Sequence, residues 1–240
     1  NDFGRMGKTP SHPELLDWLA QDFLANGQSI KHLHRLILTS STYRQDSTHD
    51  SQKAAKDSDN ALLWRMNRRK LEAEGIRDSV LSCSGKLDET LFGPSFQDFV
   101  IEKPEHSPHY QYHLHDPNDT KAFRRAIYRF LVRSQQQPFM TTLDCADPSM
   151  QVDKRNESIS SLQALALLNN GFMLVQCKEF AQRLEKEFPA ETRVRQAFKI
   201  TMGREPGAEE LSELQKFLGE NSLADLARVL FNLNEFSFVD

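Results

Sequence analysis

The chain has 240 residues, of which 38% are apolar and 27% charged, and its formal net charge is −4. This balance is typical of a globular chain in water, and the acidic net charge argues against a nucleic-acid-binding or membrane-surface protein. No segment approaches the run of about 18 apolar residues that a membrane helix needs. We therefore expect neither a nucleic acid nor a membrane as a partner.

The first quarter of the chain carries helical signals. Ser11 and Glu14 fit a capping box, and apolar residues at helical spacing follow over residues 15–24. Ser29 can cap a second helix with its own apolar face. Residues 44–58 are polar and lack periodicity, so we expect them to form an exposed loop.

The middle of the chain is less regular. Residues 59–87 predict a short helix and then a longer one that Gly85 ends, and residues 86–120 form an irregular segment. Residues 120–134 are ambiguous, because their apolar positions fit a helix while some also alternate as in a strand. The length and charge of this segment favour the helix.

Helical signals return in the last third. Ser160 and Gln163 fit another capping box, and residues 169–171 mark a break between two helices. Further helices are predicted at 191–202, 208–219 and 223–234. We expect a mainly α fold, an irregular multi-helix domain with long loops and little or no sheet. It would be a single domain over 1–240, with a possible subdivision near 140–158.

The three cysteines, Cys83, Cys145 and Cys177, stand far apart and form neither a CxxC nor a CxxCH motif. Covalent haem attachment and a zinc ribbon are therefore not expected in this chain. The odd number argues against a disulfide framework, although one bridge stays open. Buried free thiols are the simplest interpretation.

Eight stretches in chain order resemble a known family. They are DFGRMGKTPSHPELLDWLA, IKHLHRLILTSSTYRQ, RRKLEAEGIRDSVLSCSGKLD, IYRFLVRS, DCADPS, RNESISSLQALALLNNGFMLVQ, GREPGAEEL and NEFSFVD. Together they resemble the domain of unknown function 1553, also called the planctomycete PSD domain. Each stretch alone is a weak signal, but eight in order are specific, and they cover nearly the whole chain.

The resemblance implies a setting for the chain. In that family the domain lies at the C-terminus of large proteins, many of them exported, behind a second uncharacterised domain and often a cytochrome c-like domain. It implies that the chain is the C-terminal portion of an exported protein, periplasmic or at the cell surface. The upstream domains would be its partners. No cofactor is expected in this chain, and haem c would belong to an upstream domain.

The tract HSPHYQYHLHD is the first candidate site. It holds His106, His109, His113 and His115, followed by Asp116. Imidazole and carboxylate groups at this density can bind zinc, copper or nickel. The spacing matches no closed zinc module, however, and a solvated His-rich loop is the favoured interpretation.

The second candidate site combines an extended segment with a charged helix. Asp144, Asp147, Arg155 and Asn156 lie between predicted helices, where binding sites often form. Two carboxylates near an arginine could bind a sugar or hold a metal, or they could simply cap turns. Glu74 lies among acids and bases at helical spacing, which favours ion pairs over a general acid or base.

These patterns favour a non-catalytic interaction or ligand-binding module, with a polysaccharide among its candidate ligands. The alternative is a carbohydrate-active hydrolase or lyase that uses Asp144, Asp147, Arg155 and Glu74. The two hypotheses differ in geometry. An enzyme requires the carboxylates to converge in one pocket, whereas a binding module allows them to be paired off or scattered.

Overall fold

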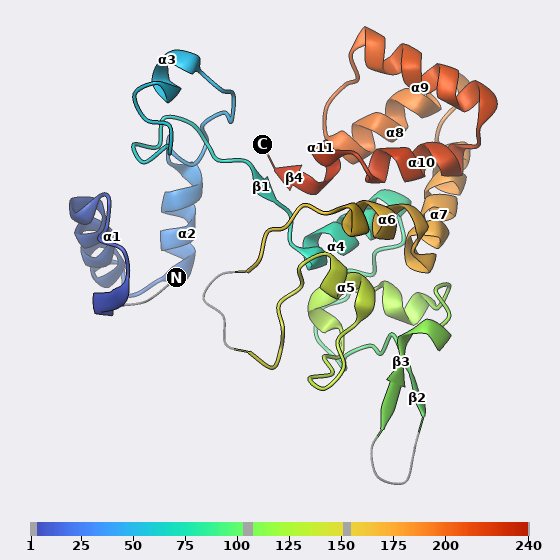
Figure 1. Ribbon diagram of the computed structural model, residues 1–240, viewed down its shortest axis with the longest axis horizontal. Helices are drawn as coiled ribbons and strands as arrows, with labels where there is room; N and C mark the ends of the chain where they lie inside the picture. The colour runs from blue at the N-terminus through green and yellow to red at the C-terminus, as the bar shows by residue number, and fades with distance from the viewer. Residues whose placement is uncertain (1–3, 103–107, 151–154, 240) are drawn as a thin grey trace. The chain divides into compact units, whose positions relative to one another are not determined.

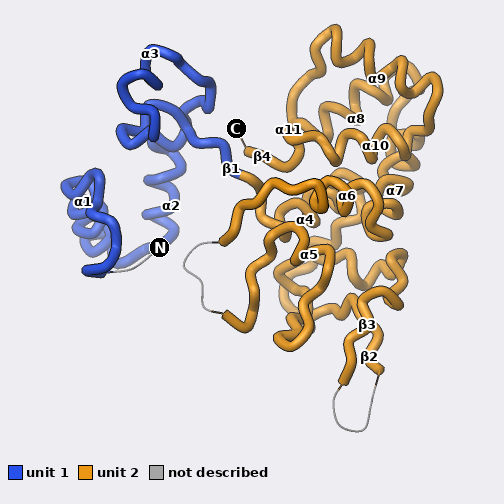
Figure 2. The backbone as a smooth tube through the Cα atoms, in the orientation of Figure 1, with its two compact units in different colours: residues 1–69, 240 blue, residues 70–239 orange. Residues whose placement is uncertain are grey.

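The computed structural model describes residues 4–102, 108–150 and 155–239. The chain divides into two compact units, residues 1–69 and residues 70–239 (Figure 2). The segment near 140–158, where the sequence allowed a subdivision, lies within the second unit.

The first unit contains short helices separated by turns. They are η1 (Gly4–Met6), α1 (Pro13–Ala25), α2 (Ile30–Thr39) and α3 (Ser51–Ala54). Ser29 caps α2 as predicted, because its hydroxyl accepts the His32 N–H at 3.3 Å. No apolar side chain is buried in the described part of this unit.

Two sequence predictions for the first unit are corrected. The N-cap of α1 is His12, and its side chain makes no capping hydrogen bond. Ser11, the predicted cap, lies one residue too early, and its hydroxyl contacts Nδ1 of His12 at 2.9 Å. The predicted loop at 44–58 contains α3, which begins because the Asp50 carboxylate accepts the first free N–H groups of the helix.

The second unit contains most of the regular structure. Its helices are α4 (Ala73–Ser84), η2 (Tyr112–Leu114), η3 (Thr120–Phe123), η4 (Ala126–Tyr128), α5 (Pro138–Thr142), α6 (Ser161–Asn169), α7 (Gly171–Glu187), η5 (Ala190–Thr192), α8 (Arg193–Met202), α9 (Ala208–Glu220), α10 (Leu223–Phe231) and α11 (Asn234–Ser237). Gly85 ends α4 in the left-handed conformation, at a φ of 73°. That conformation favours glycine, so the predicted stop at this position is confirmed.

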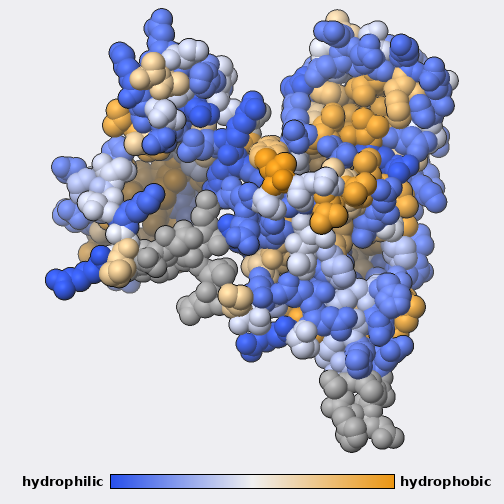
Figure 3. Space-filling model, viewed as in Figure 1, coloured by the Kyte–Doolittle hydropathy of each residue, from blue (hydrophilic) through white to orange (hydrophobic). Residues whose placement is uncertain are grey.

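The core of the second unit is built around α7, which packs against α4 and α10 (Figure 1). Fully buried side chains at helical spacing form these contacts: Ile76, Val80, Phe180, Leu184, Leu226 and Leu230. Helices α8 and α9, which follow α7 in the chain, pack apolar side chains into and against this core. Apolar residues gather over α8 to α10 on the face shown in Figure 3. The apolar periodicity of the last third therefore forms the core that it predicted.

Residues 120–134 do not form the predicted α-helix. They contain the two short turns η3 and η4, and their backbone pairs with distant segments. The Phe130 N–H donates to the Phe96 carbonyl at 2.8 Å, and the Ala126 N–H donates to Oδ1 of Asp78 at 2.7 Å. Because these groups have partners far away in the sequence, the local helix is not needed to satisfy them.

Among the described residues, the strands are short and form two small two-stranded sheets. Strands β1 (Arg69–Lys70) and β4 (Phe238–Val239) form one of them. Strands β2 (Val100–Glu102) and β3 (His109–Gln111) form the other, which is antiparallel, with Ile101 opposite Tyr110. The fold is mainly α with little sheet, as the sequence predicts. Within the described residues, no helix combines the length and the apolar character needed to cross a membrane.

Candidate functional site

A cavity of about 330 Å³ lies within the second unit, between α4, α5, the start of α7 and the segment that contains η2 and η3. Much of its wall is apolar and includes the side chains of Tyr112, Phe123, Phe139 and Phe172. Small-molecule sites have such walls and occupy about 300–1,000 Å³. The cavity therefore falls at the lower end of that range.

Asp98 is an acidic residue in the cavity wall, and its side chain is only 11% exposed. Oδ1 of Asp98 has no hydrogen-bond partner among the residues that the structure describes. An ion pair joins the same oxygen to Nη1 of Arg129, at the long distance of 3.9 Å. Burial raises the pKa of the Asp98 carboxyl, although Arg129 and Arg77 oppose that effect.

Arg77, on α4, is an arginine of the cavity wall, which His113 and His115 also line. One Nη atom donates to the Arg124 carbonyl at 2.8 Å and the other donates to the Ala122 carbonyl. The guanidinium carbon also lies over the rings of Phe96 and Phe172, at 5.0 and 5.3 Å from their centroids. Burial lowers the pKa of Arg77 to about 10, so the group remains a cation at neutral pH.

Two amide side chains line the cavity at the starts of helices. Oε1 of Gln137 accepts the Met140 N–H at 2.7 Å and caps α5. Oδ1 of Asn170 accepts the Phe172 N–H at 3.0 Å and caps α7. Because each amide oxygen is held by a helix, each NH₂ group remains as a donor. Within the described parts of the chain, neither NH₂ group has a partner.

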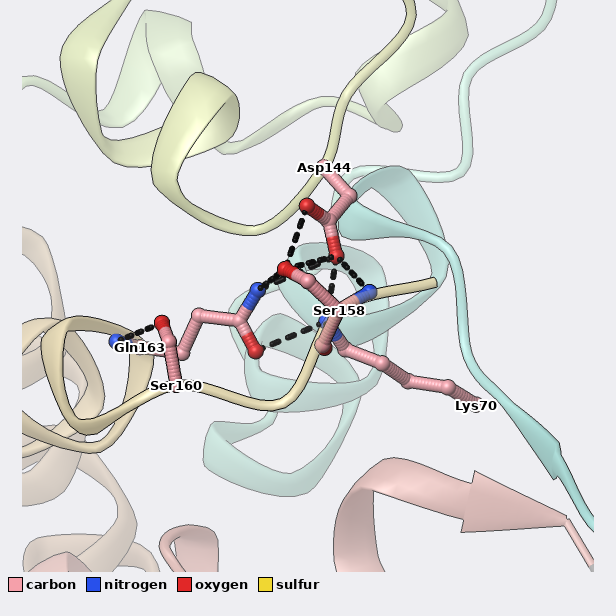
Figure 4. A network of polar contacts seen from close by, with 5 residues as sticks. All are labelled: Lys70, Asp144, Ser158, Ser160 and Gln163. Carbon is pink, nitrogen blue, oxygen red and sulfur yellow. Dashed lines mark hydrogen bonds and ion pairs between the residues drawn. The ribbon is translucent and has the colours of Figure 1, made fainter. Parts of the chain in front are cut away.

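Asp144, a predicted site residue, belongs to a different polar network (Figure 4). Its Oδ2 accepts from Lys70 Nζ at 2.9 Å, from the Ser158 N–H at 2.8 Å and from Gln163 Nε2 at 3.0 Å. Lys70 Nζ also donates to the Ser158 carbonyl at 2.8 Å and to Oε1 of Gln163 at 2.9 Å. Burial acts to raise the pKa of Asp144, but the hydrogen bonds from Lys70 and Ser158 outweigh it and lower the pKa.

The backbone at Asp144 explains how this network forms. The residue follows α5 and has a φ of 67°, in the left-handed region where aspartate is better tolerated than most residues. Ser158 and Gln163, which lie at and after the end of the following loop, then contact the carboxylate.

Glu74 and Arg155, two further predicted site residues, form an ion pair. Arg155 Nη1 lies 2.5 Å from Oε2 of Glu74, and the Cys145 thiol donates to the other carboxylate oxygen at 3.5 Å. Burial acts to raise the pKa of Glu74, but the Arg155 hydrogen bond helps to lower it. Burial and the nearby Glu74 raise the pKa of the Cys145 thiol, which disfavours a thiolate nucleophile.

The remaining predicted ligand residues lie elsewhere. Asp147 accepts the N–H and the hydroxyl of Ser149 at 2.8 and 2.6 Å, so it caps its own turn. Asn156 is exposed. The structure thus brings Glu74 and Arg155 together and gives Asp144 and Asp147 separate partners. A ligand-binding role for these residues remains a prediction.

The histidine tract is divided between the cavity and the surface. His113 and His115 line the cavity, and His109 is exposed on β3. His106 lies outside the described residues. Among the residues that are described, no three His, Cys, Asp or Glu side chains are placed to hold a metal ion together. Metal binding by the tract also remains a prediction.

Comparison with known proteins places the chain in a family. A family model described as PSD1, a protein of unknown function (DUF1553), matches residues 1–218. The chain belongs to the DUF1553 family. The resemblance seen in its sequence is thereby confirmed. No curated protein and no solved structure matches this DUF1553 chain, so its site is argued from its own geometry.

Sequence reasoning missed the most unusual residue of this DUF1553 chain. Asp98 lies in the irregular middle segment, in a region where no motif singles it out. A signal was present, because Asp98 lies between Phe96 and Phe99, and both phenylalanines are buried. In extended backbone, side chains two residues apart share a face, so the sequence would place Asp98 on the same face as Phe96.

Proposed function

We propose that this chain is a non-catalytic ligand-binding module and that its ligand occupies the cavity lined by Asp98 and Arg77. The observation that carries the proposal is the buried Asp98 carboxylate, whose Oδ1 lacks a hydrogen-bond partner among the described residues. Oδ1 itself is closed off from the cavity, so a ligand would reach Asp98 through the exposed part of its carboxylate, where a donor would stabilise the buried charge. The mostly apolar wall with a few polar groups supports the same role.

The partners of the other carboxylates support binding over hydrolysis. A general acid in glycoside cleavage has to be protonated near neutral pH, which requires a raised pKa. Asp144 and Glu74 have lowered pKa values, because Lys70 and Arg155 stabilise their ionised forms. The alternative of a carbohydrate-active hydrolase or lyase therefore has less support than a binding module.

The wider setting is part of the proposal. We infer from the family resemblance that the module belongs to an exported protein and acts beside upstream domains, one of them cytochrome c-like. Cell fractionation with an antibody against the chain tests export. Detection in the periplasmic or surface fraction is the expected result, and detection in the cytoplasm alone would contradict it.

A fragment screen followed by NMR of the isotope-labelled chain tests the binding role. The screen uses neutral, acidic and basic ring compounds, and hits are expected to shift resonances of the cavity residues. Gly171→Leu places a side chain at the cavity wall, where a Cβ would lie 3.7 Å from Pro117 Cγ. This variant is expected to abolish binding.

Gly219→Leu is the matched control, because a Cβ at Gly219 meets nothing within 4 Å and the residue is exposed on α9. It is expected to bind as the native chain does. The proposal fails if no fragment shifts cavity resonances, or if Gly171→Leu binds normally. Polysaccharide turnover that is lost in a folded Asp144→Asn variant would favour the hydrolase instead.

A further inference from the structure

We infer that the cavity binds an uncharged ring that carries hydroxyl groups, such as a single sugar residue. This inference rests on the proposed function and narrows the class of its ligand. It follows from three properties of the cavity: the balance of its charges, the arrangement of its donors and acceptors, and its aromatic wall.

The charges disfavour an ionic ligand. Asp98 and Arg77, an anion and a cation, both lie in the wall, and Nη1 of Arg129, which lies outside the wall, is 3.9 Å from Oδ1 of Asp98. A cationic ligand would be drawn to Asp98 but repelled by two arginines. An anionic ligand would be repelled by Asp98. Such repulsion is strong in a mostly apolar cavity, where the effective dielectric constant is low.

The hydrogen-bonding groups match a hydroxyl-bearing ring. Asp98 offers an acceptor, and the NH₂ groups of Gln137 and Asn170 offer donors because helix N–H groups hold their oxygens. A hydroxyl both donates and accepts, so neighbouring hydroxyls on one ring can satisfy both kinds of group. An apolar ligand would leave all three unpaired.

The wall also suits a ring of limited size. Tyr112, Phe123 and Phe139 present aromatic surface to the cavity, on which the C–H face of a ring can pack. Arg77 already lies over Phe172, so that ring is partly occupied. A volume of about 330 Å³ is near the lower limit for small-molecule sites, which favours one ring over several linked rings.

Calorimetric titration of the native chain tests the inference directly. The probes are the methyl glycosides of glucose, galactose, mannose and xylose, with glucosamine as the cationic and glucuronic acid as the anionic counterpart. We expect at least one neutral glycoside to bind, and the charged sugars to bind at least tenfold more weakly. A linear trisaccharide built from the sugar that binds best separates two kinds of ligand, a free sugar and the end of a sugar chain. Only a site for a chain end also binds the trisaccharide.

Variants that keep the fold locate the binding groups. Asp98→Asn weakens the acceptor, and Asn170→Asp removes the donor while keeping the oxygen that caps α7. Each is expected to weaken glycoside binding about tenfold, the scale of one hydrogen bond to a charged group. Asp88→Asn, an exposed carboxylate outside the cavity, is the control and should bind normally.

The outcomes separate the two proposals. If charged fragments bind the cavity and neutral glycosides do not, the inference is wrong and the proposed binding function stands. Unchanged glycoside affinity in Asp98→Asn would also overturn the inference. If nothing binds the cavity in either the glycoside titrations or the fragment screen, both fail.

Discussion

Asp144 and Asp98 are both largely buried carboxylates in irregular backbone of the second unit, yet their surroundings differ. Asp144 accepts hydrogen bonds from Lys70, Ser158 and Gln163, and its pKa is lowered. Oδ1 of Asp98 has no hydrogen bond among the described residues, and burial raises its pKa. The hydrogen bonds of Asp144 stabilise the fold, whereas the Asp98 carboxylate lies in the wall of the cavity.

The difference separates structural from functional polar residues. A buried polar group whose partners are all present is a structural element, because its removal leaves other groups unpaired. A buried polar group that lacks a partner lowers stability, and its position in a cavity wall indicates a ligand. The sequence pointed to Asp144 as a site residue, whereas the geometry favours Asp98.

The strongest test of this comparison is Lys70→Ala. Its side chain is 7% exposed, and the variant leaves Asp144 buried without its cation. Removing one partner of a buried ion pair costs about 3 kcal/mol or more, so we expect the free energy of unfolding to fall by about 3 kcal/mol. Urea denaturation at pH 7 measures it. Lys178→Ala, at an exposed lysine, is the control, and an equal loss in both variants would contradict the prediction.

Asp98→Asn is expected to change stability in the opposite direction. The variant replaces a disfavoured buried charge with a neutral amide of the same shape, so the free energy of unfolding should rise. The expected gain is about 1 kcal/mol, the scale of one unpaired buried polar group. Thermal denaturation beside Asp88→Asn measures it. A clear loss would show that the Arg129 contact stabilises the fold despite its length.

Ser158→Ala should have a smaller effect. The Ser158 hydroxyl donates to Oδ1 of Asp144 at 2.8 Å and accepts from Gln163 Nε2 at 2.9 Å. The residue is exposed and water can replace the hydroxyl, so we expect a loss of about 0.5 kcal/mol. Urea denaturation measures it, with Ser149→Ala as a control that removes a bond to Asp147 only. A loss near that of Lys70→Ala would contradict this ranking.

The smallest effect is the pH dependence of stability, and its sign differs between the two carboxylates. The raised pKa of Asp98 means that its contribution is full below 3.8, the unfolded value, and is lost as pH rises through the folded pKa. The lowered pKa of Asp144 means that its contribution is present above 3.8 and is lost as pH falls through the folded pKa. Denaturation curves between about pH 3 and 7 give the free energy of unfolding of the native chain and of each variant. As pH rises, the native chain should lose stability relative to Asp98→Asn and gain stability relative to Asp144→Asn. Divergence in the same direction would contradict the assignment.

Local signals predicted much of the fold. Ser29 caps α2, Gly85 ends α4, and α6 and α7 meet at the predicted break near Asn170. These features depend on residues within one turn of each other, which a sequence displays directly. Residues 120–134 failed as a helix because Phe96 and Asp78 supply partners from distant segments.

The predicted site residues were harder to place than the helices, because their contacts are long-range. Lys70 and Asp144 are 74 positions apart, and Glu74 and Arg155 are 81 positions apart. The sequence named Asp144, Glu74 and Arg155 as candidate ligand-binding residues, but the structure divides them between two pairs, Lys70 with Asp144 and Glu74 with Arg155. It gave His113 and His115 as candidate metal ligands while favouring a solvated loop, and the structure places both in the cavity wall.

The sequence alone determined the mainly α class, the DUF1553 family and several helix ends, since helices form from bonds four residues apart and caps are equally local. Tertiary structure decided which carboxylate accepts several hydrogen bonds and which has an oxygen without one. That property depends on burial and on partners from distant segments, and a one-dimensional pattern displays neither. Asp144 and Asp98 are the same residue type with opposite pKa shifts for this reason.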